Sequence, residues 1–217
     1  MTALDYAEQR ARMVEFQLRR RGLKDERVLD AMGRIPRELF VDEIYRVQAY
    51  DDAPVAIGWD QTISQPYMTA LMCESLMLHG DEKVLDVGTG SGYHAAVLSQ
   101  LAGRVYSIEL IPELAELARR NLSAAGLADA VEVITGDGST GYARVAPYDA
   151  ICVAAAAPEV PSALLDQLAD PGRLVIPVGS YSDQDLEVIS KSNNEIRKRV
   201  PTMCRFVPLR GDQGWKD

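Results

Sequence analysis

The chain has few of the residues that build metal sites and disulfide frameworks: only three cysteines and two histidines occur among its 217 residues. Cys73, Cys152 and Cys204 show no C-x-x-C spacing and lie within apolar stretches, so we expect reduced thiols in the core. His79 and His94 have no ligand spacing to each other or to the cysteines, and the sequence therefore gives no support to a metal site. We interpret His94 as a residue on a helix face, not as a catalytic base.

Long apolar runs and an excess of positive charge are missing as well. No segment approaches the ~20 apolar residues of a membrane-spanning helix, and Asp5 and Glu8 interrupt the amino terminus where a signal peptide would need an apolar stretch. We therefore expect a cytoplasmic protein with no membrane contact. The formal net charge is −9, which disfavours binding to a phosphate backbone, so we expect no nucleic-acid partner.

Two common nucleotide-binding signatures are also absent. An apolar run at 83–87 leads into Gly88-Thr89-Gly90-Ser91-Gly92, but a dinucleotide fingerprint would need its third glycine where Tyr93 stands, and no P-loop sequence occurs. The next apolar run ends at Glu109. This order still predicts a nucleotide-like ligand, because glycines let the backbone approach it and Glu109 can accept hydrogen bonds from both ribose hydroxyls. An NAD-dependent oxidoreductase is an alternative, weakened by Tyr93.

The middle of the chain alternates between strand and helix patterns. We predict strands at 83–87, 104–109, 131–135, 148–153 and 173–178, and helices near 92–101, 112–125 and 160–169. This alternation predicts an α/β fold with a doubly wound, mostly parallel, Rossmann-like sheet. Three helices are expected before it, ending near residues 22, 35 and 80, with an extended loop at 54–63. A hairpin at 186–200 and a last strand at 203–207 are expected after it.

The domain organisation follows from this pattern. We expect a single domain over residues 1–217, in which an N-terminal helical and loop region, residues 1–80, packs on a core of residues 81–217.

Polar residues follow three of the predicted parallel strands, which end at one edge of the sheet. They are the glycine turn at 88–92, Glu109, and Asp137 within Gly136-Asp137-Gly138. Asp137 could accept a hydrogen bond from an adenine amino group, and the alternative is an ordinary turn aspartate.

The glycine turn resembles the first motif of S-adenosylmethionine-dependent methyltransferases, in which Asp86 could face the cationic end of the cofactor. More specific segments resemble the protein-L-isoaspartate O-methyltransferase family, and they run in order from about residue 5 to about residue 215. These segments are Gln61-Thr62-Ile63-Ser64-Gln65-Pro66-Tyr67-Met68, Ala155-Ala156-Ala157-Pro158-Glu159-Val160-Pro161, the run at 172–179, and Arg205-Phe206-Val207-Pro208-Leu209.

The resemblance implies the methyltransferase form of the Rossmann-like fold and a specific reaction. The methyl group of S-adenosylmethionine would be transferred to the free carboxylate of L-isoaspartyl residues in proteins and peptides, with S-adenosylhomocysteine as product and no metal. The ester would then close to a succinimide. We expect a monomer with isoaspartyl proteins and peptides as its partners. The implied cofactor-binding residues are Thr62, Ile63, Asp86, Gly88, Thr89, Gly90, Gly92, Glu109, Asp137 and Gly138.

Ser64 is the catalytic residue that the resemblance implies. A carboxylate with a pKa of ~3.9 is already ionised at neutral pH, so no general base has to create the nucleophile. We therefore expect Ser64 to orient the substrate carboxylate by a hydrogen bond, and the alternative is that it caps the helix starting at Pro66. Two other readings of the chain stay open: a methyltransferase with a small-molecule or nucleic-acid acceptor, and a cofactor-binding sensor without turnover.

Overall fold

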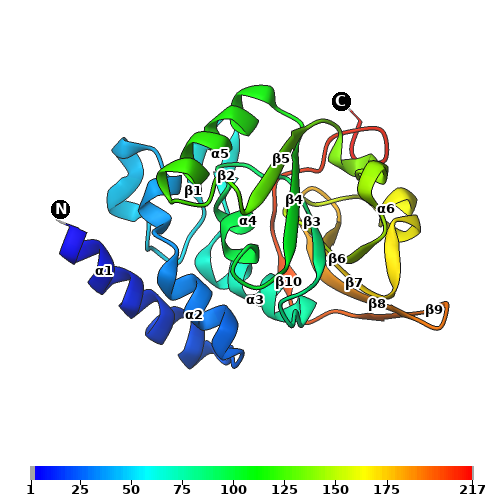
Figure 1. Ribbon diagram of the computed structural model, residues 1–217, viewed down its shortest axis with the longest axis horizontal. Helices are drawn as coiled ribbons and strands as arrows, with labels where there is room; N and C mark the ends of the chain where they lie inside the picture. The colour runs from blue at the N-terminus through cyan, green and yellow to red at the C-terminus, as the bar shows by residue number, and fades with distance from the viewer. Residues whose placement is uncertain (1–2, 217) are drawn as a thin grey trace.

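The computed structural model describes residues 3–216, and an eight-stranded sheet forms its centre (Figure 1). The strand order is β10-β8-β7-β6-β3-β4-β5, with β9 paired to β8. Five strands are parallel: β3 (Lys83–Val87), β4 (Arg104–Glu109), β5 (Val131–Thr135), β6 (Tyr148–Val153) and β7 (Leu168–Gly179). Three antiparallel strands extend the sheet: β8 (Gln184–Ser192), β9 (Glu195–Arg199) and β10 (Met203–Cys204).

The order of the parallel strands reverses in the middle of the sheet. β4 and β5 follow β3 on one side of it, and β6 and β7 lie on the other side of β3. The crevice beyond the carboxyl ends of β3 and β6 is therefore the position where open α/β sheets bind ligands.

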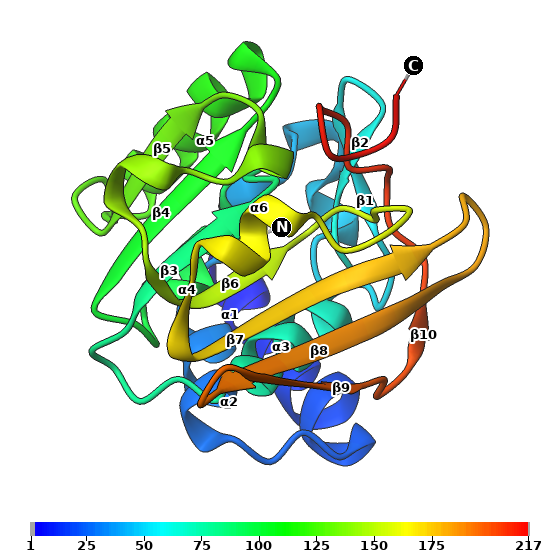
Figure 2. The same ribbon diagram turned by 90° about the vertical axis from the view of Figure 1, so that its right-hand side faces the viewer.

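Successive residues of the strands face two separate cores, because side chains alternate across a sheet. Val84 and Cys152 belong to one core, and Leu85 and Ile151 belong to the other. The first core is covered by α1 (Ala3–Arg12), α2 (Glu26–Arg34), α3 (Pro66–Leu76), α4 (Tyr93–Leu98) and α5 (Pro112–Ala124). The second is covered by α6 (Ser162–Asp166), which Figure 2 shows in front of the sheet with α1, α2 and α3 behind it.

Short helical segments connect these elements. They are the π-helix η1 (Met13–Leu18) and the 3-10 segments η2 (Arg19–Arg21), η3 (Arg37–Phe40), η4 (Glu43–Gln48), η5 (Gly138–Thr140) and η6 (Ala143–Val145).

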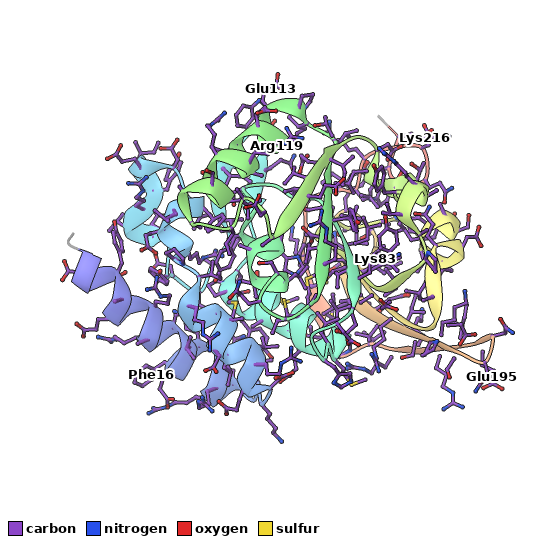
Figure 3. All side chains as sticks on the ribbon, in the orientation of Figure 1. Phe16, Lys83, Glu113, Arg119, Glu195 and Lys216 are labelled. Carbon is purple, nitrogen blue, oxygen red and sulfur yellow. The ribbon has the colours of Figure 1, made fainter. Side chains whose placement is uncertain are left out.

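Figure 3 shows Glu113, just after β4, and Lys216 near the edge where the parallel strands end, with Phe16 and Glu195 at the opposite edge.

The predicted fold class is confirmed, and the four strands expected at 83–87, 104–109, 131–135 and 148–153 have the predicted bounds. The expected loop at 54–63 is instead a hairpin of β1 (Val55–Gly58) and β2 (Gln61–Ile63). Its turn residues Trp59 and Asp60 have φ values of 50° and 56°. The sequence does not predict this turn, because neither residue is a glycine.

Two strand bounds also differ from the prediction. β7 begins at Leu168 because residues 169–172, which look like a turn, form an irregularity within the strand between its pairings to Tyr148 and Ala150. β10 ends at Cys204 because the chain then leaves β8, and Pro208 bridges to Ala156 instead. Within residues 3–216, no helix combines the length and the apolar character that crossing a membrane requires. The arrangement as one domain stays a prediction.

Candidate active site

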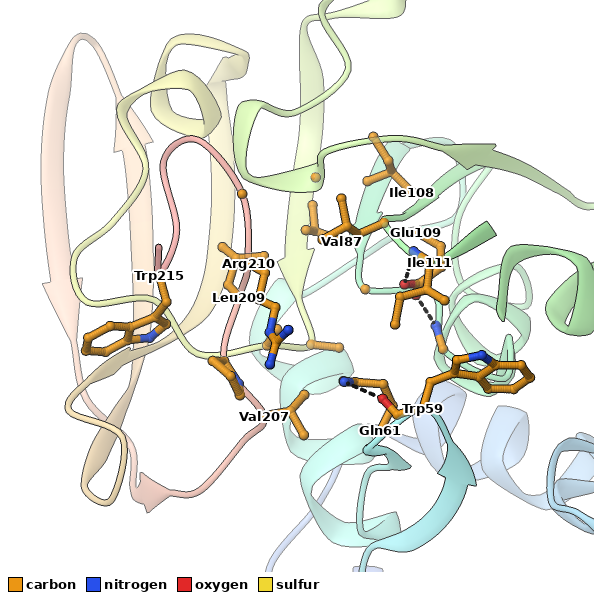
Figure 4. Close-up of a pocket in the computed structure, with 18 of the residues that line it drawn as sticks. Trp59, Gln61, Val87, Ile108, Glu109, Ile111, Val207, Leu209, Arg210 and Trp215 are labelled. Atoms are coloured by element: carbon orange, nitrogen blue, oxygen red, sulfur yellow. Dashed lines mark hydrogen bonds between the residues drawn. The ribbon is translucent and has the colours of Figure 1, made fainter. Parts of the chain in front are cut away.

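A cavity of about 480 Å³ lies at the carboxyl ends of the parallel strands (Figure 4). Its volume is in the range of sites for small molecules. One wall comes from the ends of β3 and β4 and the residues after β5 and β6, and the opposite wall comes from the β1–β2 hairpin and the C-terminal segment, residues 207–216. The lining residues are Trp59, Asp60, Gln61, Thr62, Val87, Gly88, Gly90, Ile108, Glu109, Leu110, Ile111, Gly138, Ala154, Ala155, Val207, Pro208, Leu209, Arg210, Gly211, Trp215 and Lys216.

Glu109 connects the glycine turn to the end of β4. Its Oε2 accepts a hydrogen bond from the N–H of Gly90 at 2.8 Å, and its Oε1 accepts one from the N–H of Ile111 at 3.0 Å. Burial raises the pKa of Glu109, although these backbone N–H groups oppose the shift. A carboxylate has about four acceptor positions, so both oxygens can still accept hydrogen bonds from a ligand's hydroxyls.

Gly90 needs to be a glycine for two reasons. Its φ of 54° lies in the left-handed region, and a Cβ there would be 3.2 Å from Cδ1 of Ile57 in the hairpin. Gly88 also lines the pocket, whereas Gly92 does not. A Cβ at Gly92 would be 3.3 Å from that of Ala118, so this third glycine allows α4 to pack against α5.

Gly138 packs tightly against two apolar residues of the same wall. A Cβ at Gly138 would be 2.5 Å from Cγ1 of Val87 and 3.1 Å from Cγ2 of Ile108, and both of these residues line the pocket. The missing side chain therefore allows the loop after β5 to lie directly against these two residues, which form an apolar surface beside the hydroxyl acceptor Glu109. This combination fits the adenosine part of S-adenosylmethionine.

Asp137, for which adenine binding is a prediction, lies outside the pocket lining. Its Oδ1 accepts hydrogen bonds from the N–H of Ser139 at 2.8 Å and from its hydroxyl at 2.7 Å. Its Oδ2 accepts one from the N–H of Asp212 at 2.8 Å. Asp137 therefore caps η5, as a turn aspartate would, and also ties the C-terminal segment to the edge of the sheet.

Asp86 does not face the pocket either, because its carboxylate is completely buried and bonded beneath the glycine turn. Oδ1 is 2.8 Å from Nδ1 of His94, and Oδ2 accepts a hydrogen bond of 2.7 Å from the hydroxyl of Ser107. Ser107 in turn shares a 2.7 Å hydrogen bond with Thr89, another residue expected to contact the cofactor that is not in the lining.

His94 lies on a face of α4, as predicted, and there it is a buried partner of Asp86. Its Nε2 is 3.8 Å from Sγ of Cys152. Burial opposes a charge on this ring, but Cys152 and Asp86 outweigh that effect and raise the pKa of His94 well above its usual range. Burial also raises the pKa of the Cys152 thiol to about 11.

The segment expected to hold the catalytic serine leads away from the pocket wall. Thr62 lines the cavity, Ile63 is buried in the core, and Ser64 is half-buried outside the lining. Gln65 is the residue that precedes α3, and no side chain caps this helix, so Ser64 does not have the alternative role as a cap. Within the described part of the chain, the Ser64 hydroxyl has no hydrogen-bond partner, while the Ser64 carbonyl accepts one from Nη2 of Arg37 at 2.8 Å.

The C-terminal segment contributes lining residues that the sequence did not identify. The indole N–H of Trp215 donates to the carbonyl of Ala156 at 3.0 Å, and its ring stacks on Tyr181 with the centroids 4.0 Å apart. Figure 4 shows the guanidinium of Arg210 pointing across the pocket toward Gln61. No motif marks these residues, because their position depends on contacts with segments far away in the sequence.

Among residues 3–216, no group of three or more His, Cys, Asp or Glu side chains could hold a metal ion.

Comparisons with known proteins agree on one family. The model of the family described as Protein-L-isoaspartate(D-aspartate) O-methyltransferase matches residues 8–214. The chain is 54% identical to protein-L-isoaspartate O-methyltransferase 2 of Marinobacter nauticus, over 97% of each protein. It is 50% identical to protein-L-isoaspartate O-methyltransferase of Hyperthermus butylicus, over 98% of this chain and 92% of that protein.

Solved structures of the same kind have the same fold. A protein-L-isoaspartate O-methyltransferase is 30% identical with a TM-score of 0.84, over 94% of this chain and 67% of the other. A Plasmodium falciparum protein described as a putative protein-L-isoaspartate O-methyltransferase, in complex with S-adenosyl-L-homocysteine, is 28% identical with a TM-score of 0.81, over 93% of this chain and 98% of the other.

Proposed function

The chain belongs to the protein-L-isoaspartate(D-aspartate) O-methyltransferase family. We propose which residues of its pocket bind the cofactor and which bind the substrate in the reaction that defines this family. The enzyme transfers the methyl group of S-adenosylmethionine to the free carboxylate of an L-isoaspartyl residue in damaged proteins and peptides. The proposal assigns the cofactor to the wall formed by β3 and β4 and the substrate to the opposite wall.

Glu109, Gly90 and Gly138 are the residues that would hold the cofactor. The observation that carries this assignment is the buried Glu109 carboxylate, which is fixed by two backbone N–H groups beside the apolar surface where Gly138 packs against Val87 and Ile108. Its remaining lone pairs would accept the ribose hydroxyls, and Val87 and Ile108 would contact the adenine ring. When bound, S-adenosylmethionine supplies a methyl group on a positively charged sulfur, which is already a good electrophile.

Ser64 is the residue that would orient the substrate. Its hydroxyl lacks a partner within residues 3–216, so it can donate a hydrogen bond to the isoaspartyl carboxylate without breaking another. The carboxylate is ionised at neutral pH, with a reference pKa of ~3.9, so the protein needs to align the oxygen and exclude water but not remove a proton. The methyl ester then closes to a succinimide without further help from the enzyme.

The C-terminal segment and the hairpin would contact the substrate peptide. Within this wall, Arg210 and Lys216 bring positive charge to the C-terminal segment and Asp60 brings negative charge to the hairpin, whereas Glu109 brings negative charge to the cofactor wall. The cationic C-terminal segment suits the carboxylate of the isoaspartyl residue.

We also propose that the protein works in the cytoplasm, as a monomer. Free thiols at Cys73, Cys152 and Cys204 suit a reducing compartment, and the net charge of −9 favours separate, soluble molecules. Sedimentation equilibrium tests the monomer directly, and a concentration-dependent mass would contradict it.

The decisive experiment measures methyl transfer to a pair of peptides that differ only by isoaspartyl or aspartyl at one position. Base-labile label on the isoaspartyl peptide alone is expected. For Ser64→Ala, loss of a hydrogen bond to a charged group costs ~1.5–3 kcal/mol, so kcat should fall roughly ten- to hundredfold while S-adenosylhomocysteine binds as before. Ser190→Ala is the matched control, because Ser190 is a half-buried serine on β8 outside the pocket. Unchanged turnover by Ser64→Ala would exclude the role proposed for Ser64.

A further inference from the structure

Arg37 is a buried arginine that no motif identified. It begins η3, and its side chain is 0% exposed. Its Nε donates to the carbonyl of Ala49 at 2.6 Å, and its Nη2 donates to the carbonyl of Ser64 at 2.8 Å. Its guanidinium carbon lies 4.7 Å from the ring centroid of Tyr93, the first residue of α4 after the glycine turn. One side chain therefore connects Ser64 with the turn beside the cofactor site.

The charge on this side chain has no acidic partner. No Asp or Glu oxygen within residues 3–216 forms an ion pair with Arg37, and its Nη1 is buried without a hydrogen-bond partner in the same part of the chain. Burial lowers the pKa of Arg37, yet an arginine remains charged at neutral pH. A buried charge without an acidic partner is costly. Its hydrogen bonds to the carbonyls of Ala49 and Ser64 offset part of this cost, so the arginine is tied to the positions of these two carbonyls.

The local structure around Ser64 shows what the guanidinium contributes. Ser64 lies after the end of β2 and before the start of α3, so neither element fixes its carbonyl. The helix that follows has no side-chain cap at Gln65. The hydrogen bond from Arg37 is thus the contact that fixes the peptide unit of Ser64, and the bond to Ala49 and the ring of Tyr93 in turn fix the guanidinium.

We propose that Arg37 is a positioning residue for Ser64, which holds the Ser64 carbonyl so that the Ser64 hydroxyl is presented to the substrate carboxylate. This inference rests on the role proposed above for Ser64. Lysine cannot replace arginine here, because an ammonium group lacks the rigid fork that reaches two carbonyls and lies against an aromatic ring.

A double-mutant cycle between Arg37→Lys and Ser64→Ala tests the inference. A residue that acts through Ser64 loses its effect once the hydroxyl is gone, whereas independent effects multiply. Arg37→Lys alone should lower kcat for the isoaspartyl peptide by roughly tenfold, as expected for one charge-assisted hydrogen bond. In the Ser64→Ala background, the same change should lower kcat by less than about threefold, and affinity for S-adenosylhomocysteine should stay within about twofold throughout.

Arg27→Lys is the matched control. Arg27 also donates to two backbone carbonyls, but these belong to Leu78 and Leu101 and not to Ser64. Its replacement should lower the melting temperature without changing kcat or its response to Ser64→Ala. If Arg37→Lys does not fold, Arg37→Gln enters the same cycle, because its amide can still donate to one carbonyl.

The outcomes separate the two proposals. If Ser64→Ala alone leaves kcat unchanged, the role of Ser64 fails, and the role of Arg37 fails with it. If Ser64→Ala slows turnover but the effects of the two changes multiply, Arg37 acts independently and only this inference is overturned. Unchanged turnover by Arg37→Lys would overturn it as well.

Discussion

Asp137 and Asp212 are joined by a 2.8 Å hydrogen bond in which the carboxylate of the first accepts the backbone N–H of the second, 75 residues later in the chain. A Cβ at the neighbouring Gly211 would lie 2.0 Å from Oδ1 of Asp137. This close contact holds the C-terminal segment against the loop after β5, and it makes the substrate wall of the pocket dependent on a residue of the cofactor side.

Asp137→Asn should therefore weaken substrate binding. In one orientation its amide group would present an N–H to the N–H of Asp212, and a lost bond to a charged group costs ~1.5–3 kcal/mol. We expect KM for an isoaspartyl peptide to rise roughly tenfold and hydrogen exchange to accelerate over residues 210–216. Asp129→Asn, at an exposed turn residue, is the control. A fall in affinity for S-adenosylhomocysteine, with KM for the peptide unchanged, would instead support adenine binding by Asp137.

Gly138→Ala should deform the apolar surface proposed to contact the adenine ring. The new methyl group would overlap Val87 and press on Ile108, and overpacking of this kind costs about 1–3 kcal/mol. We expect a roughly ten- to hundredfold weaker Kd for S-adenosylhomocysteine by isothermal titration calorimetry. Gly136→Ala is a control two residues away, because its Cβ would make an ordinary 3.5 Å contact with Ile108. Equal affinities for both variants would exclude this location of the ring.

Cofactor affinity should depend on the protonation of Glu109. Burial raises the pKa of this carboxyl, and ribose hydroxyls donate to its ionised form. Affinity should thus be complete above that pKa and decrease as the pH falls through it, starting at a higher pH than an ordinary glutamate with a pKa of ~4.3 would give. Glu109→Gln should bind weakly and lose this pH dependence. A pH profile of Kd identical in both proteins would contradict the assignment.

The buried pair of His94 and Asp86 should make stability depend on pH in the opposite sense to a carboxylate pair. Because the pKa of His94 is raised in the folded protein, its contribution is complete below the unfolded value of ~6.5 and is lost as the pH rises through the folded value. The melting temperature should decrease over that window, and His94→Gln should remove the decrease. His79→Gln, at the exposed histidine, should leave it in place.

Four parallel strands could be predicted with their bounds because each is a short run rich in apolar and β-branched residues between turn residues. The runs at 83–87 and 148–153 are buried on both faces, which is the pattern that a central parallel strand gives. The β1–β2 hairpin was missed because its turn uses Trp59 and Asp60 at positive φ in place of the usual asparagine and glycine.

The site was predicted in part, for a related physical reason. Strand ends identify the edge of the sheet where Glu109 and Gly138 lie, and both line the pocket. Strand ends do not indicate the hydrogen-bond partner of a carboxylate. Asp86 is bonded to His94, and Asp137 is bonded to a backbone group 75 residues away. Neither partner can be predicted from the local sequence. Arg210 and Trp215 reach the pocket through similar long-range contacts.

The two walls of the pocket also differ in when they become available during protein synthesis. The glycine turn, Glu109 and Gly138 leave the ribosome first, whereas residues 207–216 come about 70 residues later, as the sequence order requires. A nascent chain can therefore expose the glycine turn, Glu109, Gly138 and the hairpin while the C-terminal part of the opposite wall does not yet exist. Translation that stops before Val207 would leave the pocket open on the side that this segment closes.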